Sequence, residues 1–240
     1  HLAAQPLVRY SYKNPVETYQ TNVIGTLNVL EISRKVGSVK AVVNVTTDKC
    51  YENFESLKGY KESDKLGGYD PYSSSKGCSE LITTAYRKSY YKSLGIGLAS
   101  ARAGNVLGGG YWSEDRLIPD IFKSFDLCEK VTIRNPDAIR PWQHVLDPLS
   151  GYLLLAKKLY EYPAKYSQAW NFGPSESDIK TVGWVVENIA KQLDKSNSWK
   201  YIKASDELHE SQILKLNISK AIENLGWTPS WNIVQVLNKT

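Results

Sequence analysis

The chain has 240 residues with a formal net charge of +5; 42% of the residues are hydrophobic and 23% are charged. This length can bury a core as one large domain or as two small ones, and no apolar run is long enough for a transmembrane helix. The lysines and arginines form no stripe and no nucleic-acid-binding motif is present, so we expect neither a membrane nor nucleic acid as a partner.

The first predicted elements in chain order are a helix and a strand. Residues 1–5 resemble the end of a strand that runs into a loop. Asn14 and Pro15 supply an N-cap and a first-turn proline, and apolar residues follow at helical spacing as far as Leu30. The segment Lys40–Thr46 is apolar at nearly every position, which is typical of a parallel strand buried on both faces.

Helices and strands alternate along the rest of the chain. We predict helices at 71–93, 115–129, 146–162 and 181–194, and strands at 97–103, 130–133, 169–172 and 199–203. This alternation predicts an α/β fold with a mostly parallel sheet. The stretch beyond Gly104 is richer in loops and tryptophan, so we expect a smaller substrate-binding subdomain there.

Tyr72 and Lys76 lie four residues apart on a predicted helix and therefore share one face. An ammonium group beside a phenol favours the phenolate, and a tyrosine acting as a base near neutral pH needs its pKa lowered by about three units. The preceding strand ends in Thr47-Asp48-Lys49, and ligands of open parallel sheets bind at the carboxyl ends of strands. These residues predict a catalytic site, the alternatives being a solvated helix pair and a capping turn.

The same features resemble the extended branch of the short-chain dehydrogenase family, in which a strand ending in Ser or Thr precedes Tyr-x-x-x-Lys. The similarity runs in the same order over nearly the whole chain, through His1-Leu2-Ala3-Ala4-Gln5, Asn22-Val23-Ile24-Gly25-Thr26, Arg102-Ala103-Gly104-Asn105-Val106-Leu107-Gly108 and Leu225-Gly226-Trp227-Thr228-Pro229. The resemblance implies a Rossmann-like doubly wound sheet. Residues 1–104 would form the remainder of the NAD-binding domain, and residues 105–240 mostly the substrate-binding subdomain, with some segments returning to the sheet.

Finer features resemble the nucleotide-sugar 4,6-dehydratases within this branch, and among them those that act on CDP-glucose. Thr47-Asp48-Lys49 stands where dTDP-glucose dehydratases carry Thr-Asp-Glu. The other matching segments are Gly67-Gly68-Tyr69-Asp70-Pro71-Tyr72, Gly108-Gly109-Gly110 and Ile139-Arg140-Pro141-Trp142-Gln143-His144. The resemblance implies a lyase that oxidises C4 of the sugar, eliminates water across C5 and C6, and reduces C6 with recycled NAD.

The resemblance also implies a role for each catalytic residue. Tyr72, assisted by Thr47 and Lys76, would take the proton of the C4 hydroxyl while hydride passes to NAD. Lys49 would then remove the C5 proton, and Asp48 would protonate the departing C6 hydroxyl. Because Lys49 must be neutral and Asp48 protonated for these tasks, we expect the pKa of each to be shifted from its ordinary value.

Further residues are expected to bind the cofactor and the substrate by the same resemblance. The expected NAD contacts are Ala3, Ala4, Asn22, Tyr72 and Lys76. The expected substrate contacts are Asn105, Arg116, Arg140 and Asn171. Arg140 is favoured for the diphosphate because a guanidinium binds phosphate in a bidentate fork, and its Pro-Trp neighbours indicate a partly dry setting.

The glycine-rich turn with which the family binds the NAD pyrophosphate has no match in the sequence. The chain also ends soon after Trp231, where another helix is expected. We therefore expect a fragment that lacks both ends and binds NAD poorly. The alternatives are a nucleotide-sugar epimerase, a dTDP- or GDP-sugar dehydratase, and a non-catalytic NAD-binding remnant.

The three cysteines and three histidines are dispersed, so we expect no metal site and no disulfide framework. Scattered cysteines and the lack of a basic signal-peptide region favour a cytoplasmic protein. The resemblance implies a homodimer, formed through the helix that carries Tyr72 and the one that starts at Pro15. It also implies a place in deoxysugar synthesis for bacterial surface polysaccharide such as O-antigen.

Overall fold

A three-stranded parallel sheet forms the centre of the fold. The computed structural model describes residues 1–195, 199–202, 208–209 and 211–240. The sheet has the order β1-β2-β7, with β1 at Ala41–Val45, β2 at Gly97–Ala103 and β7 at Ala169–Phe172. Asn44 pairs with Ser100, and Ser100 pairs with Ala169, so the carboxyl ends of all three strands meet at one edge.

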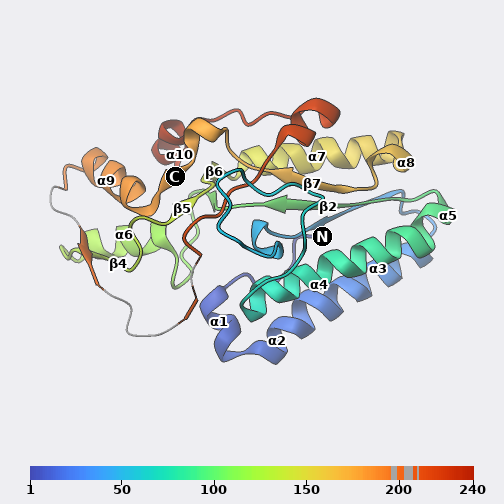
Figure 1. Ribbon diagram of the computed structural model, residues 1–240, viewed down its shortest axis with the longest axis horizontal. Helices are drawn as coiled ribbons and strands as arrows, with labels where there is room; N and C mark the ends of the chain where they lie inside the picture. Colours follow the sequence, from blue (N-terminus) through green and yellow to red (C-terminus); the bar gives the residue numbers. More distant parts are fainter. Residues whose placement is uncertain (196–198, 203–207, 210) are drawn as a thin grey trace.

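Helices cover both faces of this sheet, which gives three layers (Figure 1). Helices α3 (Gly25–Lys35) and α4 (Pro71–Tyr86) lie on one face, and α7 (Leu146–Glu161) with α8 (Pro163–Tyr166) lies on the other. The predicted α/β fold with a parallel sheet is therefore confirmed.

The central strand β2 is buried along its whole length, as its small apolar residues predict. A Cβ at Gly97 would lie 2.8 Å from the backbone oxygen of Leu159, so glycine lets α7 approach the sheet closely. The bounds of β2 and β7 agree with the prediction, whereas β1 is one residue shorter at each end than Lys40–Thr46.

Helix α4 begins where the sequence predicts and delivers Tyr72 and Lys76 to the sheet edge. Asp70 caps its first turn by accepting hydrogen bonds from the Ser73 amide (2.9 Å) and the Ser73 hydroxyl (2.6 Å), and Pro71 occupies the first helical position. The predicted helix at 71–93 is continuous, but it contains a π-helical turn at Arg87–Tyr91 before α5 (Lys92–Leu94). The left-handed Gly95, with φ of 67°, ends it.

The first residues run along the open edge of β1. The His1 amino group donates to the Val43 oxygen (2.9 Å), and the Val45 amide donates to the His1 oxygen (3.0 Å), a strand-like pairing that agrees with the expectation for residues 1–5. The helices that follow are α1 (Val8–Lys13), α2 (Pro15–Tyr19), a π-helical turn (Gln20–Ile24) and then α3.

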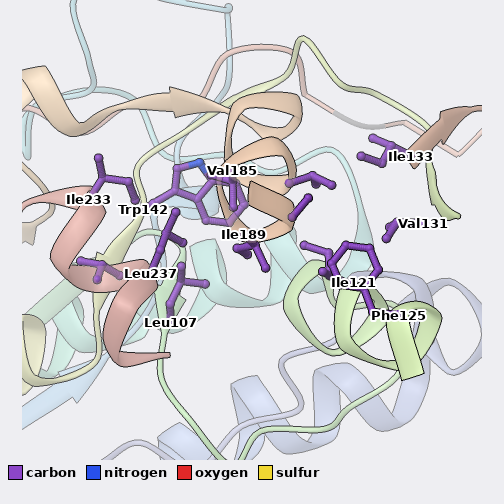
Figure 2. Packing of buried hydrophobic residues seen from close by; sticks show 13 residues of the cluster. Leu107, Ile121, Phe125, Val131, Ile133, Trp142, Val185, Ile189, Ile233 and Leu237 are labelled. Carbon is purple, nitrogen blue, oxygen red and sulfur yellow. The ribbon is translucent and has the colours of Figure 1, made fainter. Parts of the chain in front are cut away.

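A second core lies beyond the sheet and draws only on residues after Val106. Its buried side chains come from α6 (Leu117–Asp126), α9 (Val182–Gln192) and α10 (Ile233–Lys239), and Trp142 lies among them (Figure 2). Helix α10 starts with a capping box between Asn232 and Gln235, where the sequence predicts a further helix. The division of the chain at residue 104 stays a prediction.

Short elements complete the second half of the chain. They are β3 (Val106–Leu107), β4 (Val131–Ile133), β5 (Ile139–Arg140), β6 (Gln143–His144), β8 (Lys180–Thr181), β9 (Trp199–Tyr201) and single helical turns at Glu176–Asp178 and Ala221–Leu225. Only β4 and β9 were predicted, and Lys203 of the predicted last strand lies outside the described residues. Two-residue strands carry too little periodic signal to be found from a sequence. Helix α6 is shorter than the predicted 115–129.

Candidate active site

The turn after β1 holds the first group of predicted catalytic residues. Thr47 precedes a short 3₁₀ turn at Asp48–Cys50 and caps it by accepting a hydrogen bond from the Lys49 amide (3.3 Å). The Thr47 hydroxyl donates to Oδ1 of Asp48 (3.0 Å). Both side chains are buried, whereas Lys49 is half-buried. The local sequence therefore folds so that a hydroxyl and a carboxylate point inward at the sheet edge.

Tyr72 reaches this turn from α4. The Thr47 side chain lies close enough to the Tyr72 hydroxyl group to favour its ionised form, and 8% of Tyr72 is exposed. Burial raises the pKa of Tyr72 to about 12, Thr47 and the charge of Arg116 oppose this rise, and Asp48 adds to it. The sequence predicts convergence of Tyr72 with Thr47, and the structure brings them together. The lowered pKa expected for a base is not present, because burial outweighs the nearby positive charge.

Lys76 lies one turn further along α4 and is equally enclosed. Its Nζ donates to the Val45 oxygen at 3.2 Å, which places the ammonium group beneath the end of β1. Burial lowers the pKa of Lys76 to about 8, while the negative charge of Glu80 acts in the opposite direction. An ammonium with such a pKa exchanges its proton near neutral pH, which suits a proton-handling group.

Asp48 has an environment that favours the protonated form of its carboxyl group. Burial raises its pKa, and the charge of Lys49, the Thr47 hydrogen bond and the charge of Arg140 only partly offset this effect. Its Oδ2 is buried without a hydrogen-bond partner among the described residues. This atom lies against Gly104, where an added Cβ would come within 2.9 Å of it. The direction of the shift agrees with the sequence-based requirement that Asp48 be protonated.

The expected cofactor residues are divided between the surface and the interior. Ala3 is exposed and Ala4 is half-buried next to the end of β1. Asn22 is buried, and its side chain is engaged within the protein: Oδ1 accepts from the Gln5 amide (2.8 Å), and Nδ2 donates to the Gln5 oxygen (3.0 Å) and to Ser75 (2.9 Å). Asn22 thus holds the segment that carries the alanines against α4.

Two of the expected substrate residues lie near the catalytic groups. Arg116 is half-buried, its charge acts on the Tyr72 phenol, and its Nη2 donates to the Pro6 oxygen (2.8 Å). Arg140 is buried, as its neighbours predict, and its charge acts on Asp48. Its Nη2 donates to the Ser211 oxygen at 2.6 Å, so the guanidinium also fixes the backbone of that segment.

The two expected asparagines differ in their surroundings. Asn105 is half-buried at the sheet edge, and its backbone oxygen accepts from Gln143 (3.0 Å). Asn171 is fully buried: Oδ1 accepts from Tyr51 (2.7 Å), and Nδ2 donates to the backbone oxygens of Tyr60 (2.8 Å) and Asn217 (3.1 Å). This geometry does not support direct substrate contact by Asn171, because every hydrogen-bonding group of its amide is used inside the protein.

Three side chains close to the site escaped the sequence analysis. Tyr152 of α7 is close enough to Tyr72 and Asp48 for their charges to add to the burial that raises its pKa. Glu80 and Arg102 form a buried ion pair beneath the turn, with Oε2 and Nη2 separated by 2.7 Å. A charge in an apolar strand, such as Arg102 in β2, is a signal that a buried partner exists.

Two features are absent from the described part of the chain, a metal site and a membrane-spanning helix. Its histidine, cysteine and acidic side chains form no cluster that could hold a metal ion. None of its helices combines the length and the apolar character needed to cross a lipid bilayer.

Known proteins of similar sequence and fold are nucleotide-sugar enzymes. The model of the family described as GDP-mannose 4,6 dehydratase matches residues 1–240. The CDP-glucose 4,6-dehydratase of Salmonella typhimurium strain LT2 is 52% identical over 244 residues, and the match covers 100% of this chain and 68% of that protein.

Solved structures extend the likeness to the fold. A dTDP-glucose 4,6-dehydratase from Bacillus anthracis, solved in complex with NAD, is 27% identical with a TM-score of 0.80, and the match covers 94% of this chain and 68% of that one. A UDP-glucose 4-epimerase from Thermotoga maritima is 23% identical with a TM-score of 0.85 over 100% of this chain and 74% of its own, a likeness of fold alone. The expected Rossmann-like fold is thereby confirmed.

Proposed function

Because the chain belongs to the GDP-mannose 4,6-dehydratase family, we propose that it carries the catalytic part of an NAD-dependent lyase that converts CDP-glucose into CDP-4-keto-6-deoxyglucose. The choice of CDP-glucose is supported by the 52% identity to a CDP-glucose 4,6-dehydratase. The single observation that carries the reaction type is the meeting of Tyr72 with Thr47 and a buried Asp48 of raised pKa at the carboxyl end of β1. Oxidation of an alcohol needs a base, which Tyr72 can provide with the help of Thr47. Elimination of water needs an acid, which Asp48 can provide.

The residues at the end of β1 fit the reactive end of the cofactor. Ala3 and Ala4 have small side chains and follow His1, whose backbone oxygen binds the Val45 amide, and the buried Lys76 ammonium binds the Val45 oxygen (3.2 Å). We assign these residues and Tyr72 to NAD binding, and Asn22 to holding the alanine segment in place. When bound, NAD would take up the hydride released from C4 and return it to C6.

Oxidation of the sugar depends on Tyr72 and its two helpers. The Tyr72 oxygen takes the proton of the C4 hydroxyl, and Thr47, which lies beside the phenol, favours its ionised form. Because burial raises the pKa of Tyr72 to about 12, the phenolate must be stabilised by positive charge when the reaction begins. Arg116 is near enough to contribute, and we assign the same task to Lys76, which shares a face of α4 with Tyr72, and to the positive ring of the oxidised cofactor.

Elimination of water depends on the two residues that follow Thr47. The C4 ketone acidifies the C5 proton, which Lys49 removes as a base. Asp48 gives its proton to the C6 hydroxyl, so that the C6–O bond breaks and water leaves. The raised pKa of Asp48 supports this assignment, because burial favours the protonated carboxyl group, which is the form that can act as an acid.

The substrate anchors are assigned by position and charge. Arg140 and Arg116 are the proposed diphosphate ligands, since each is a guanidinium within electrostatic reach of Asp48 or Tyr72. Asn105, half-buried at the carboxyl edge of the sheet, is proposed to contact the sugar nucleotide.

We also propose a homodimer, because apolar side chains are exposed on the helices expected to form its interface. Val16 of α2 is 68% exposed, Ile32 of α3 is 62% exposed and Leu81 of α4 is 60% exposed. Burying such side chains against a second copy is favourable by about 25 cal/mol per Å² of apolar surface.

The free state of all three cysteines supports a reducing location such as the cytoplasm.

Product analysis tests the proposed function. The protein is incubated with NAD and, in parallel reactions, with CDP-glucose, dTDP-glucose or GDP-mannose. The masses of the products are measured by mass spectrometry. We expect a product lighter by one water from CDP-glucose, formed faster than from the other two. An isomer of unchanged mass would identify an epimerase instead. If dTDP-glucose reacted faster than CDP-glucose, the assignment of CDP-glucose as the substrate would be wrong.

A further inference from the structure

Glu80 continues the catalytic face of α4. It follows Tyr72 and Lys76 at the same spacing of four residues, which places all three on one side of the helix. Its side chain is fully buried and accepts three hydrogen bonds. Oε1 accepts from the Thr46 hydroxyl (2.6 Å), and Oε2 accepts from the Ser100 hydroxyl (2.7 Å) and from Nη2 of Arg102 (2.7 Å).

Arg102 extends this contact to the far side of the turn at Asp48–Cys50, which we call the catalytic turn. It stands near the end of β2, where 3% of it is exposed. Its Nη1 donates to the Tyr51 hydroxyl (2.8 Å), and its guanidinium lies over the Tyr51 ring at 4.8 Å. The Tyr51 hydroxyl in turn donates to Asn171 (2.7 Å) on β7, so one connected set of bonds runs from α4 across the sheet.

The two residues held by this pair bracket the catalytic turn. Thr46 immediately precedes Thr47, and Tyr51 immediately follows Cys50, the last residue of the turn. We propose that Glu80 and Arg102 are positioning residues of the dehydratase, which fix the turn carrying Thr47 and Asp48 relative to the helix carrying Tyr72 and Lys76. This inference rests on the proposed function.

The charges of the pair support the same role. Burial alone would raise the pKa of Glu80, but the hydrogen bond and charge of Arg102 outweigh it and hold that pKa below its ordinary value. Glu80 therefore stays ionised next to the catalytic helix. Its negative charge opposes the burial that lowers the pKa of Lys76, and so helps to keep the Lys76 ammonium protonated.

The test compares Glu80→Gln with Glu31→Gln, a control that removes a half-buried carboxylate of α3, which binds Arg34 (2.6 Å), Lys35 (2.8 Å) and the Tyr86 hydroxyl at the last residue of α4 (3.2 Å). Amide hydrogen exchange of the folded protein is followed for residues 46–52 and, as an internal reference, for α9 in the separate second core. With Glu80→Gln we expect exchange at 46–52 to rise about tenfold or more, and exchange in α9 to stay as in the control. Turnover of CDP-glucose should fall about 100-fold in kcat with KM nearly unchanged, because the reacting groups are misplaced while substrate binding is kept.

Two results would overturn the inference. One is exchange at 46–52 equal to that of the control, and the other is an increase spread equally over α9, which would indicate general loss of stability. If Glu80→Gln does not fold, the double variant Glu80→Gln/Arg102→Met leaves no unpaired buried charge and must show the same local rise in exchange. If the unaltered protein does not dehydrate CDP-glucose, the proposed function fails, whereas the exchange measurement still decides whether the pair holds the turn.

Discussion

Replacing Gly104 by alanine should displace Asp48, the proposed acid of the elimination step, and leave Tyr72 in place. A Cβ at this position would lie 2.3 Å from Cγ of Pro141 and 2.9 Å from Oδ2 of Asp48. Ordinary carbon contacts are about 3.5–4.0 Å, so both neighbours must move by roughly 1 Å. Pro141 is a rigid ring next to Arg140, and Asp48 is held by Thr47.

The size of the effect follows from these two displacements. Overpacking of this kind costs about 1–3 kcal/mol, which for a chain of this size lowers the melting temperature by roughly 2–4 °C for each kcal/mol. A misplacement of about 1 Å in a catalytic group can cost about 100-fold in rate. We therefore expect kcat for the formation of the keto sugar to fall by about 10- to 100-fold, with a smaller change in KM.

Turnover of CDP-glucose and thermal unfolding measure the two effects separately. Gly37→Ala is the matched control, since an added Cβ there would meet no atom within 4 Å, and it should behave as the unaltered protein. If Gly104→Ala keeps both its turnover and its melting temperature, the close approach of Gly104 to Asp48 is wrong.

Three further predictions concern Tyr72, Asp48 and the proposed dimer. Tyr72→Phe should fold normally and lose about 10²- to 10⁴-fold in kcat, as measured by product formation, and activity within a few-fold of the unaltered protein would remove Tyr72 from the reaction. Because the pKa of Asp48 is raised, its ionisation destabilises the folded state once the pH exceeds the pKa of an aspartate in the unfolded chain, near 3.9. Asp48→Asn should therefore melt higher than the unaltered protein at neutral pH, and this gain should vanish as the pH falls below about 4; a gain that persists in acid would contradict a raised pKa. Leu81→Glu should turn the dimer into a monomer in analytical ultracentrifugation, whereas Leu153→Glu, at a 74% exposed site on α7, should not; equal behaviour of the two variants would exclude the proposed interface.

The catalytic pair and the turn could be predicted because local rules determine them. Tyr72 and Lys76 share a face through helical spacing alone, and Asp70 with Pro71 marks where their helix begins. The apolar run before Thr47 marks a buried strand, and the end of such a strand is where an α/β protein binds its ligands. Spacing and strand patterning were sufficient to place these groups at one sheet edge.

Burial and partner choice could not be predicted in the same way. The raised pKa of Asp48 arises from burial, and Gly104, which lies against its Oδ2, comes from a distant part of the chain. For Tyr72 the balance between burial and nearby cations depends on distances that no sequence pattern contains, and burial prevails.

The buried asparagines show why a motif does not fix a role. Asn22 and Asn171 match positions expected to meet ligands, yet both amides bond within the protein. An amide at the end of a strand or within a helix can serve either purpose, and only its neighbours decide which. Arg102, in contrast, had a readable signal, because an arginine within a buried strand requires a buried acceptor.

The most direct test of the account is a crystal structure of the protein with CDP-glucose and NAD, and the measured quantity is the distance from the Tyr72 hydroxyl oxygen to O4 of the sugar. We predict a hydrogen bond of about 2.5–3.0 Å, with Oδ2 of Asp48 directed at the C6 hydroxyl. A sugar whose O4 lies out of reach of Tyr72, or whose C6 hydroxyl lies on the side away from Asp48, would contradict it.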